Sequence, residues 1–155
     1  MHRTAILIPV YNGLEYTRKC ISQLTDLITK TNSKVEYKII VIDDASQDGS
    51  YDYIAKHFPQ VILLKGGGNL WWSGGINVGA RYAIEEMQVD YLLLWNNDVY
   101  AGEDYFIELN KIIETTNGNE VVGSKVYFSN KPEIIQLYGG YFNPKTGVKF
   151  PYAYN

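Results

Sequence analysis

Short apolar runs alternate along the chain with longer segments in which apolar residues recur at the helical period. The runs cover residues 5–8, 38–42, 61–64 and 91–95, and Val121-Val122 begins a fifth. Unbroken apolar runs of this length are typical of strands covered on both faces, as in a parallel sheet. We therefore predict five buried strands.

The segments between these runs predict amphipathic helices. Their apolar faces are formed by Cys20, Ile21, Leu24, Leu27 and Ile28, by Ile76, Ala80, Ala83, Ile84 and Met87, and by Phe106, Leu109 and Ile113. A shorter helix is expected near residues 51–57, stopped by Pro59. Alternation of strand and helix indicates an α/β fold with right-handed crossovers. We expect a Rossmann-like, mostly parallel central sheet with helices on both faces.

The last 28 residues differ in pattern from the rest of the 155-residue chain. Turn signals at Lys131-Pro132, Gly139-Gly140 and 143–147 separate short segments rich in Tyr and Phe, so residues 128–155 predict a β-rich extension. The length suits one domain over residues 1–155. The chain stops directly after a strand-like segment, and we expect it to be the N-terminal part of a longer protein.

Charge and cysteine content exclude some classes of protein. The net charge is −3, from 14 Lys and Arg against 17 Asp and Glu, which argues against an electrostatic nucleic-acid binder. Cys20 is the single cysteine, which rules out an intrachain disulfide and fits a reducing compartment. No apolar run approaches the roughly 20 residues of a membrane span. We expect a cytoplasmic setting and leave peripheral contact with the inner face of the membrane open.

Polar side chains gather where three predicted strands end. Strand one leads into residues 9–13, strand two into 43–46 and strand four into Asn96-Asn97-Asp98. Ligands of open α/β sheets bind outside the carboxyl ends of the strands, so these side chains predict one site. Asp98 is a candidate ligand for Mg²⁺ or Mn²⁺, which take one or two carboxylates and fill the rest with water and phosphate oxygens. The alternative for Asp98 is a helix cap or a loop-closing acid.

Three further features of these loops have both a ligand-binding and a structural interpretation. Asp43 and Asp44 point in opposite directions on extended backbone, so one can face a base or ribose while the other closes a turn; both could also serve turn chemistry alone. Tyr11 could stack on a nucleobase or pack on the following helix. The six glycines between residues 66 and 79 could approach phosphates or form a flexible loop. Trp71 and Trp72 could be core residues or wall a sugar pocket.

Taken together, these motifs resemble family 2 glycosyltransferases with the glycosyltransferase-A fold, over about residues 4–127. The resemblance rests on Ile8-Pro9-Val10-Tyr11-Asn12, on residues 41–50, on Asn77-Val78-Gly79-Ala80-Arg81 and on Asn96-Asn97-Asp98. No dinucleotide-binding fingerprint, P-loop or nucleophile elbow competes with it. The Trp71–Gly75 stretch is most similar to the rhamnosyltransferase-like branch of bacterial surface polysaccharide synthesis.

The resemblance implies a UDP-, dTDP- or GDP-sugar donor and a glycan or lipid-linked acceptor. The implied donor-binding residues are Pro9, Tyr11, Asn12, Asp43, Asp44, Asn77, Gly79 and Asn97, with Asn77 and Gly79 in the loop that enters the third helix. Asp98 is the implied ligand of Mg²⁺ or Mn²⁺. Family members typically invert the anomeric configuration, with an Asp or Glu deprotonating the acceptor hydroxyl.

The chain also departs from the family pattern. The metal motif has one carboxylate where two or three are more common, and Tyr82 replaces a common Asn. Glu133 is the only acid after Glu120, so no catalytic base is assigned and this chain is expected to bind a donor without transferring the sugar. A non-catalytic binding module and, less favoured because no cation follows strand one before Arg18, a sugar-phosphate nucleotidyltransferase are the alternatives. The sugar, the acceptor and the oligomeric state, including a homodimer, stay open.

Overall fold

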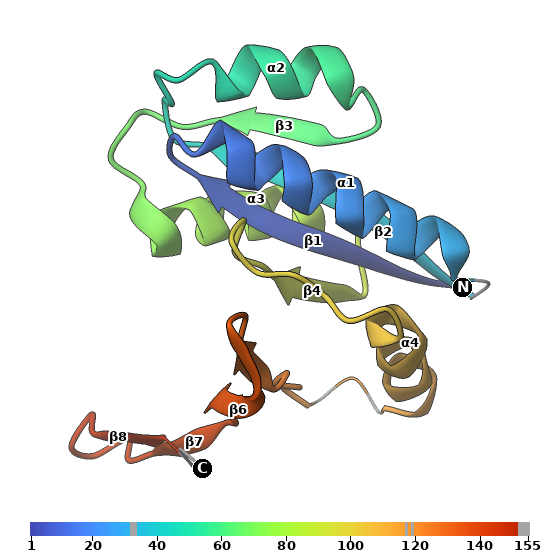
Figure 1. The fold of residues 1–155 in the computed structure, drawn as a ribbon, viewed down its shortest axis with the longest axis vertical. Helices are drawn as coiled ribbons and strands as arrows, with labels where there is room; N and C mark the ends of the chain where they lie inside the picture. Colours follow the sequence, from blue (N-terminus) through green and yellow to red (C-terminus); the bar gives the residue numbers. More distant parts are fainter. Residues whose placement is uncertain (32–33, 117, 119, 152–155) are drawn as a thin grey trace. The chain divides into compact units, whose positions relative to one another are not determined.

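Four parallel strands lie in the order β3-β2-β1-β4 at the centre of residues 1–118 (Figure 1). The computed structural model describes residues 1–31, 34–116, 118 and 120–151. The strands are β1 (His2–Val10), β2 (Val35–Asp43), β3 (Ile62–Lys65) and β4 (Tyr91–Leu94). The helices are α1 (Leu14–Lys30), α2 (Ser50–His57), α3 (Trp71–Glu85) and α4 (Tyr105–Thr115). The predicted α/β class with a parallel central sheet is confirmed.

Both faces of the central strands β1 and β2 are covered, which explains their unbroken apolar runs. The prediction of a buried strand over residues 91–95 is wrong in part, because β4 lies at the edge of the sheet and leaves Leu92 and Leu94 exposed. Alternate residues of β1 point to opposite faces. Ile6, Ile8 and Val10 belong to a core with residues of α1, α2 and α4, whereas Ala5 and Leu7 belong to a second core with residues of α3. All five side chains are almost fully buried. Helices on opposite faces thus hold the central strands and fix where the strands end.

The register of the sheet brings the ends of β1 and β2 to the same level, whereas β4 ends opposite a residue within β1. Val10 at the end of β1 pairs with Asp43 at the end of β2, and Leu7 of β1 pairs with Leu94 at the end of β4. The chain builds β1, β2 and β3 outward on one side and then returns to place β4 on the other side of β1. This reversal makes the carboxyl ends of β1 and β4 a topological switch point, where open α/β sheets bind ligands.

The structure corrects two boundaries. Val121-Val122 begins no strand: residues 120–125 lie outside regular structure, and Val121 is fully exposed. Trp71 is already the first residue of α3, so the glycine-rich loop is shorter than expected.

A second compact unit covers Asn119–Asn155. Its β5 (Val126–Phe128) pairs antiparallel with β6 (Lys131–Leu137), and β7 (Gly140–Phe142) pairs with β8 (Lys149–Pro151). Pro132, expected in a turn, lies within β6. None of the helices among the described residues is both long and apolar enough to cross a bilayer.

Candidate functional site

The loops after β1 and β2 are tied together by three hydrogen bonds. The Asn12 N–H donates to Ser46 Oγ at 2.7 Å, and the Gln47 N–H donates to Asn12 Oδ1 at 2.9 Å. The Leu14 N–H donates to Asp48 Oδ2 at 2.9 Å. Asn12 has φ 58°, a left-handed conformation that Asn tolerates better than most residues. The structure thus gives the predicted donor residue Asn12 a role in joining two loops.

Asp48 holds the starts of two helices. Besides the N–H of Leu14, the first residue of α1, its carboxylate accepts hydrogen bonds from the N–H (3.0 Å) and Oγ (2.6 Å) of Ser50, the first residue of α2. Partial burial pushes the pKa of Asp48 up, but the hydrogen bonds from Ser50 and Leu14 outweigh it and hold the pKa below its usual value. Asp48 is not among the predicted site residues, although an Asp just before a helix is a recognised start signal.

Asp44 holds the glycine-rich loop. Its Oδ1 accepts a hydrogen bond from the Gly68 N–H at 2.6 Å, and its Oδ2 accepts from the N–H groups of Leu70 at 2.7 Å and Trp71 at 3.2 Å. Both carboxylate oxygens are therefore engaged with backbone. Asp44 thus closes the loop at residues 66–71. The turn that follows the paired acids is instead closed by Asp43, which accepts a hydrogen bond from the Ser46 N–H.

Asp43 is fully buried at the end of β2, and only one of its oxygens has a partner. Oδ1 accepts a hydrogen bond from the Ser46 N–H at 2.9 Å. Among the described residues, nothing donates to the buried Oδ2. A buried acceptor without a donor costs about 1–3 kcal/mol, so such an atom beside a ligand-binding edge is a candidate acceptor for a ligand N–H or O–H.

An aromatic pocket of about 220 Å³ opens beside these loops. This pocket, called the aromatic pocket below, is lined by Pro9, Val10, Tyr11, Ile42, Asp44, Trp71, Trp72 and Gly75. Tyr11 is 63% exposed and Trp71 is 85% exposed, so neither side chain is a core residue. Among the described residues, no Lys or Arg lines the pocket. Its lining suits a flat, weakly charged group better than a phosphate.

The loop after β4 is tied to α3 and to α1. Trp72 Nε1 donates a hydrogen bond to Asn96 Oδ1 at 2.8 Å, and Asn97 Nδ2 donates to Thr17 Oγ1 at 2.9 Å. The pocket residue Trp72 thus reaches the end of β4 directly. Asn97, which was predicted to bind the sugar-nucleotide donor, uses one of its amide N–H groups in the hydrogen bond to α1.

Asp98 follows Asn97 and is exposed. In the described part of the chain, no hydrogen bond or ion pair engages its carboxylate, and no group of three or more His, Cys, Asp or Glu side chains could hold a metal ion. A free, exposed carboxylate fits Mg²⁺ or Mn²⁺ only when most other ligands come from water or from a bound diphosphate. The structure therefore fits a metal ion that binds together with a diphosphate-containing ligand of the protein.

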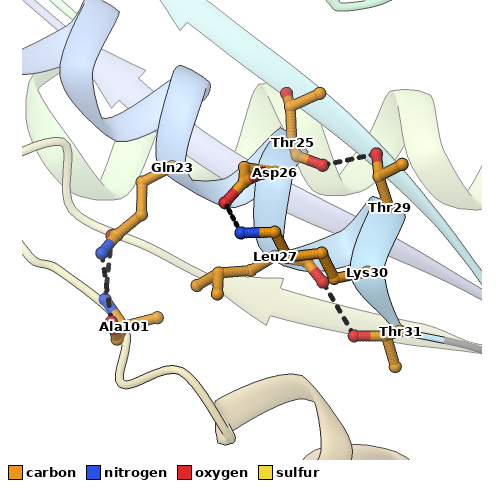
Figure 2. Close-up of polar contacts among 8 residues, drawn as sticks. All are labelled: Gln23, Thr25, Asp26, Leu27, Thr29, Lys30, Thr31 and Ala101. Carbon is orange, nitrogen blue, oxygen red and sulfur yellow. Dashed lines mark hydrogen bonds and ion pairs between the residues drawn. The ribbon is translucent and has the colours of Figure 1, made fainter.

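The segment after Asp98 is fixed to α1 by a two-way amide pair. Gln23 Nε2 donates a hydrogen bond to the Ala101 carbonyl oxygen, and the Ala101 N–H donates to Gln23 Oε1, both at 3.1 Å (Figure 2). Gln23 thereby supports the loop that carries Asp98, the candidate metal ligand. The sequence did not reveal this role of Gln23, because only the fold brings together two residues that lie 78 positions apart.

Two residues that were predicted to bind the sugar-nucleotide donor lie elsewhere than expected. Asn77 and Gly79 belong to α3 itself and not to the loop that enters it. A Cβ on the buried Gly79 would lie 2.7 Å from Ile42 Cδ1, so the absence of a side chain lets α3 pack on the sheet. Asn77 is exposed and lines a second hollow of about 430 Å³ with Lys65 and Arg81. Neither residue lines the aromatic pocket.

Curated relatives of the chain are glycosyltransferases. It is 31% identical over 105 residues to the poly(ribitol-phosphate) beta-glucosyltransferase of Bacillus spizizenii, covering 66% of this chain and 16% of that protein. It is 30% identical over 130 residues to glycosyltransferase GlyA of Streptococcus pneumoniae, covering 82% of this chain and 17% of that protein. The chain thus spans less than a fifth of the length of these two relatives.

Solved structures of glycosyltransferases share the fold. The mannosyltransferase PcManGT from Pyrobaculum calidifontis, in complex with GDP-Man and Mn²⁺, matches with a TM-score of 0.59 at 17% identity, over 82% of this chain and 36% of that one. S. aureus TarS 1–349 in complex with UDP matches with a TM-score of 0.52 at 18% identity, over 83% and 43%. Both support the expected glycosyltransferase-A type fold.

The family follows from the sequence as well as from the fold. Residues 5–152 match the sequence profile of the family described as Glycosyl transferase family 2, which is nearly the whole chain. This confirms the resemblance drawn from the four motifs. The chain belongs to glycosyl transferase family 2.

Proposed function

We propose that the chain is the donor-binding part of an inverting glycosyltransferase that holds a nucleotide-diphospho-sugar with Mg²⁺ or Mn²⁺. The sugar would pass to an acceptor hydroxyl of a glycan or a lipid-linked glycan. One observation carries the proposal: hydrogen bonds join the loops after β1 and β2, and the pocket residue Trp72 donates a hydrogen bond to Asn96, two residues before the exposed, unengaged carboxylate of Asp98. The PcManGT complex with GDP-Man and Mn²⁺ supports this use of the fold.

The two ends of the site suit the two ends of a nucleoside diphosphate. The aromatic pocket is apolar and carries no cation, so it suits the base. Asp43 Oδ2 is an acceptor for a base N–H or a ribose hydroxyl. Asp98 would hold the cation together with the diphosphate, and the cation would neutralise charge on the departing nucleoside diphosphate. Pro9, Tyr11, Asp44 and Asn12 shape the base end, while Asn97 fixes the loop that carries Asp98.

The general base is assigned to no residue of this chain. Glu133 is the only carboxylate after Glu120, and no second acidic motif follows Asp98 at the expected place. We propose that the base lies outside these residues, so that the chain binds donor but does not transfer the sugar by itself. A non-catalytic nucleotide-sugar-binding protein is the second candidate. Sugar transfer by the full reading frame, with an inverted anomeric product, would separate the two. A cytoplasmic setting and peripheral membrane association stay predictions.

Thermal unfolding tests donor binding. UDP, dTDP or GDP with Mn²⁺ should raise the melting temperature, because a ligand at 100 times its Kd stabilises the folded state by about 2.7 kcal/mol. Asp98→Asn removes the negative charge with little change in shape and should abolish the part of the shift that depends on Mn²⁺. Glu114→Gln is the matched control, since Glu114 is an exposed acid in the last turn of α4.

Two results would contradict the proposal. The first is the absence of any shift with the three nucleotides at millimolar concentration. The second is an Mn²⁺-dependent shift that Asp98→Asn and Glu114→Gln leave equally intact, because the metal would then bind elsewhere.

A further inference from the structure

Trp71 combines strain with exposure. Its φ is 57°, in the left-handed region where a bulky side chain is an outlier and glycine is at home. Its side chain is 85% exposed, and no ring contact joins it to another aromatic residue in the described part of the chain. Neither core packing nor an aromatic neighbour therefore explains a tryptophan here. Strained residues of this kind concentrate at ligand-binding sites.

The strained backbone is held by a buried carboxylate. Asp44 Oδ2 accepts hydrogen bonds from the N–H groups of both Leu70 and Trp71, and its Oδ1 fixes Gly68 two residues earlier. A Cβ on Gly66 would lie 2.6 Å from Asp44 Oδ1, so the loop also lies directly against this carboxylate. Asp44 is therefore a positioning residue that sets where the Trp71 backbone stands.

Trp71 stands at the mouth of the aromatic pocket. Tyr11, exposed by 63%, and Trp72 line the same pocket, while Pro9 and Ile42 supply apolar lining. The described part of the chain places no Lys or Arg side chain in this pocket that would bind a phosphate. Aromatic faces at an apolar pocket without cations favour a flat, π-rich group, which in a nucleotide-sugar is the base.

We propose that Trp71 is a stacking residue for the nucleobase of the donor and, with Tyr11, forms an aromatic clamp on it. The inference rests on the proposed function and deepens it, because it assigns the base to the aromatic pocket and names Trp71 as a determinant of affinity. Stacking tolerates every base, so the clamp contributes affinity for UDP, dTDP and GDP alike.

Two substitutions separate stacking from structure. Trp71→Gly removes the indole and also relieves the left-handed strain, so the melting temperature without ligand should equal or exceed that of wild type. Trp71→Phe keeps an aromatic face at the same backbone position. Each variant is titrated calorimetrically with UDP, dTDP and GDP in the presence of Mn²⁺. Inorganic pyrophosphate with Mn²⁺ is the internal control, because it carries the charged part of the ligand without a base.

The expected result is a Kd for the nucleotides that rises about tenfold or more in Trp71→Gly, as found when a stacked base loses its aromatic partner. Trp71→Phe should keep most of the affinity, and pyrophosphate should bind all three proteins equally. Unchanged nucleotide affinity in Trp71→Gly would overturn the inference alone. Equal losses for nucleotides and pyrophosphate would overturn it too, since Trp71 would then act through the loop. If wild type binds no nucleotide, the proposed function fails first and the clamp falls with it.

Discussion

Three acids close together in the sequence do three different things. Asp43 is buried and keeps one oxygen without a protein donor. Asp44 uses both oxygens on the glycine-rich loop, and Asp48 joins the starts of α1 and α2. Adjacent residues of an extended segment point opposite ways, so Asp43 and Asp44 serve different loops. At the scale of the residue, Asp44 and Asp48 engage both carboxylate oxygens, whereas Asp43 keeps one buried oxygen without a donor among the described residues.

Asp48 gives a prediction with a pH signature. Asp48→Ala should lower the free energy of unfolding at pH 7 by about 1–2 kcal/mol, the usual cost of losing a carboxylate at a helix start. The pKa of Asp48 is lowered in the folded protein, so this stabilisation is present above the unfolded pKa and is lost as the pH falls through the folded pKa. Urea unfolding at pH 7 and at acidic pH measures both effects.

The control for Asp48 is Asp52→Ala, an exposed acid in the first turn of α2. It should cost no more than a few tenths of a kcal/mol. A variant at Asp48 that is as stable as Asp52→Ala at neutral pH would show that the hydrogen bonds to Leu14 and Ser50 contribute nothing. If Asp48→Ala lost as much stability at acidic pH as at pH 7, the contribution of these hydrogen bonds would not depend on the ionised carboxylate.

At the scale of the element, glycines of α3 form its close contact with the sheet. A Cβ on Gly75 would lie 2.9 Å from Pro9 Cβ, and one on Gly79 would lie 2.7 Å from Ile42 Cδ1. Glycine lowers helix propensity, yet here it allows the helix to approach β1 and β2 closely. Pro9 and Gly75 both line the aromatic pocket, so this close approach also shapes the site.

Gly75→Ala tests the contact between α3 and β1. The methyl group meets a rigid proline ring, and overpacking of this kind costs about 1–3 kcal/mol, against about 1 kcal/mol gained in helix propensity. We expect a net loss of stability and weaker nucleotide binding, measured by urea unfolding and calorimetry. Ser73→Ala, an exposed position in the same helix, should be neutral or stabilising. A gain in stability for Gly75→Ala as well would contradict the tight contact.

Elements were predictable where burial alone decides them. The apolar runs in β1 and β2 are buried between helices, and their pattern is enough to identify them. The run in β4 also predicted a strand, but not its edge position, at which Leu92 and Leu94 are exposed. The start of α3 was missed because Trp71–Gly75 contains two glycines. Glycines favour a loop unless a close contact with the sheet requires them, and the sequence alone does not show that contact. Val121-Val122 has strand propensity but no strand partner in the described residues, so tertiary context overrode local preference.

The scale of the whole molecule decides how the site is assembled. Because parallel strands end at one edge, the meeting of the loops after β1, β2 and β4 could be predicted from the order of the elements. Contacts over long sequence distances could not: Gln23 with Ala101, Asn97 with Thr17 and Trp72 with Asn96 depend on the fold. Asn77 and Gly79 were assigned from motif position, and the fold places them outside the aromatic pocket.

Cys20 reports on the integrity of residues 1–118. The thiol is fully buried in the core between the sheet and α1, and burial raises its pKa to about 12. The thiolate is the reactive form, so native protein at pH 8 should resist iodoacetamide. Alkylation measured by mass spectrometry should appear only in step with urea unfolding. Because the folded pKa is raised, the associated stability is complete below the unfolded pKa and is lost at higher pH. Rapid labelling of native protein would contradict this burial.

A crystal structure of the chain with Mn²⁺ and whichever of UDP, dTDP or GDP raises the melting temperature most tests the central claim. The account predicts the base in the aromatic pocket between Tyr11 and Trp71, and anomalous scattering from Mn²⁺ beside Asp98. Nucleotide bound instead in the second hollow, against Lys65 and Arg81, would contradict it. So would a manganese ion away from Asp98.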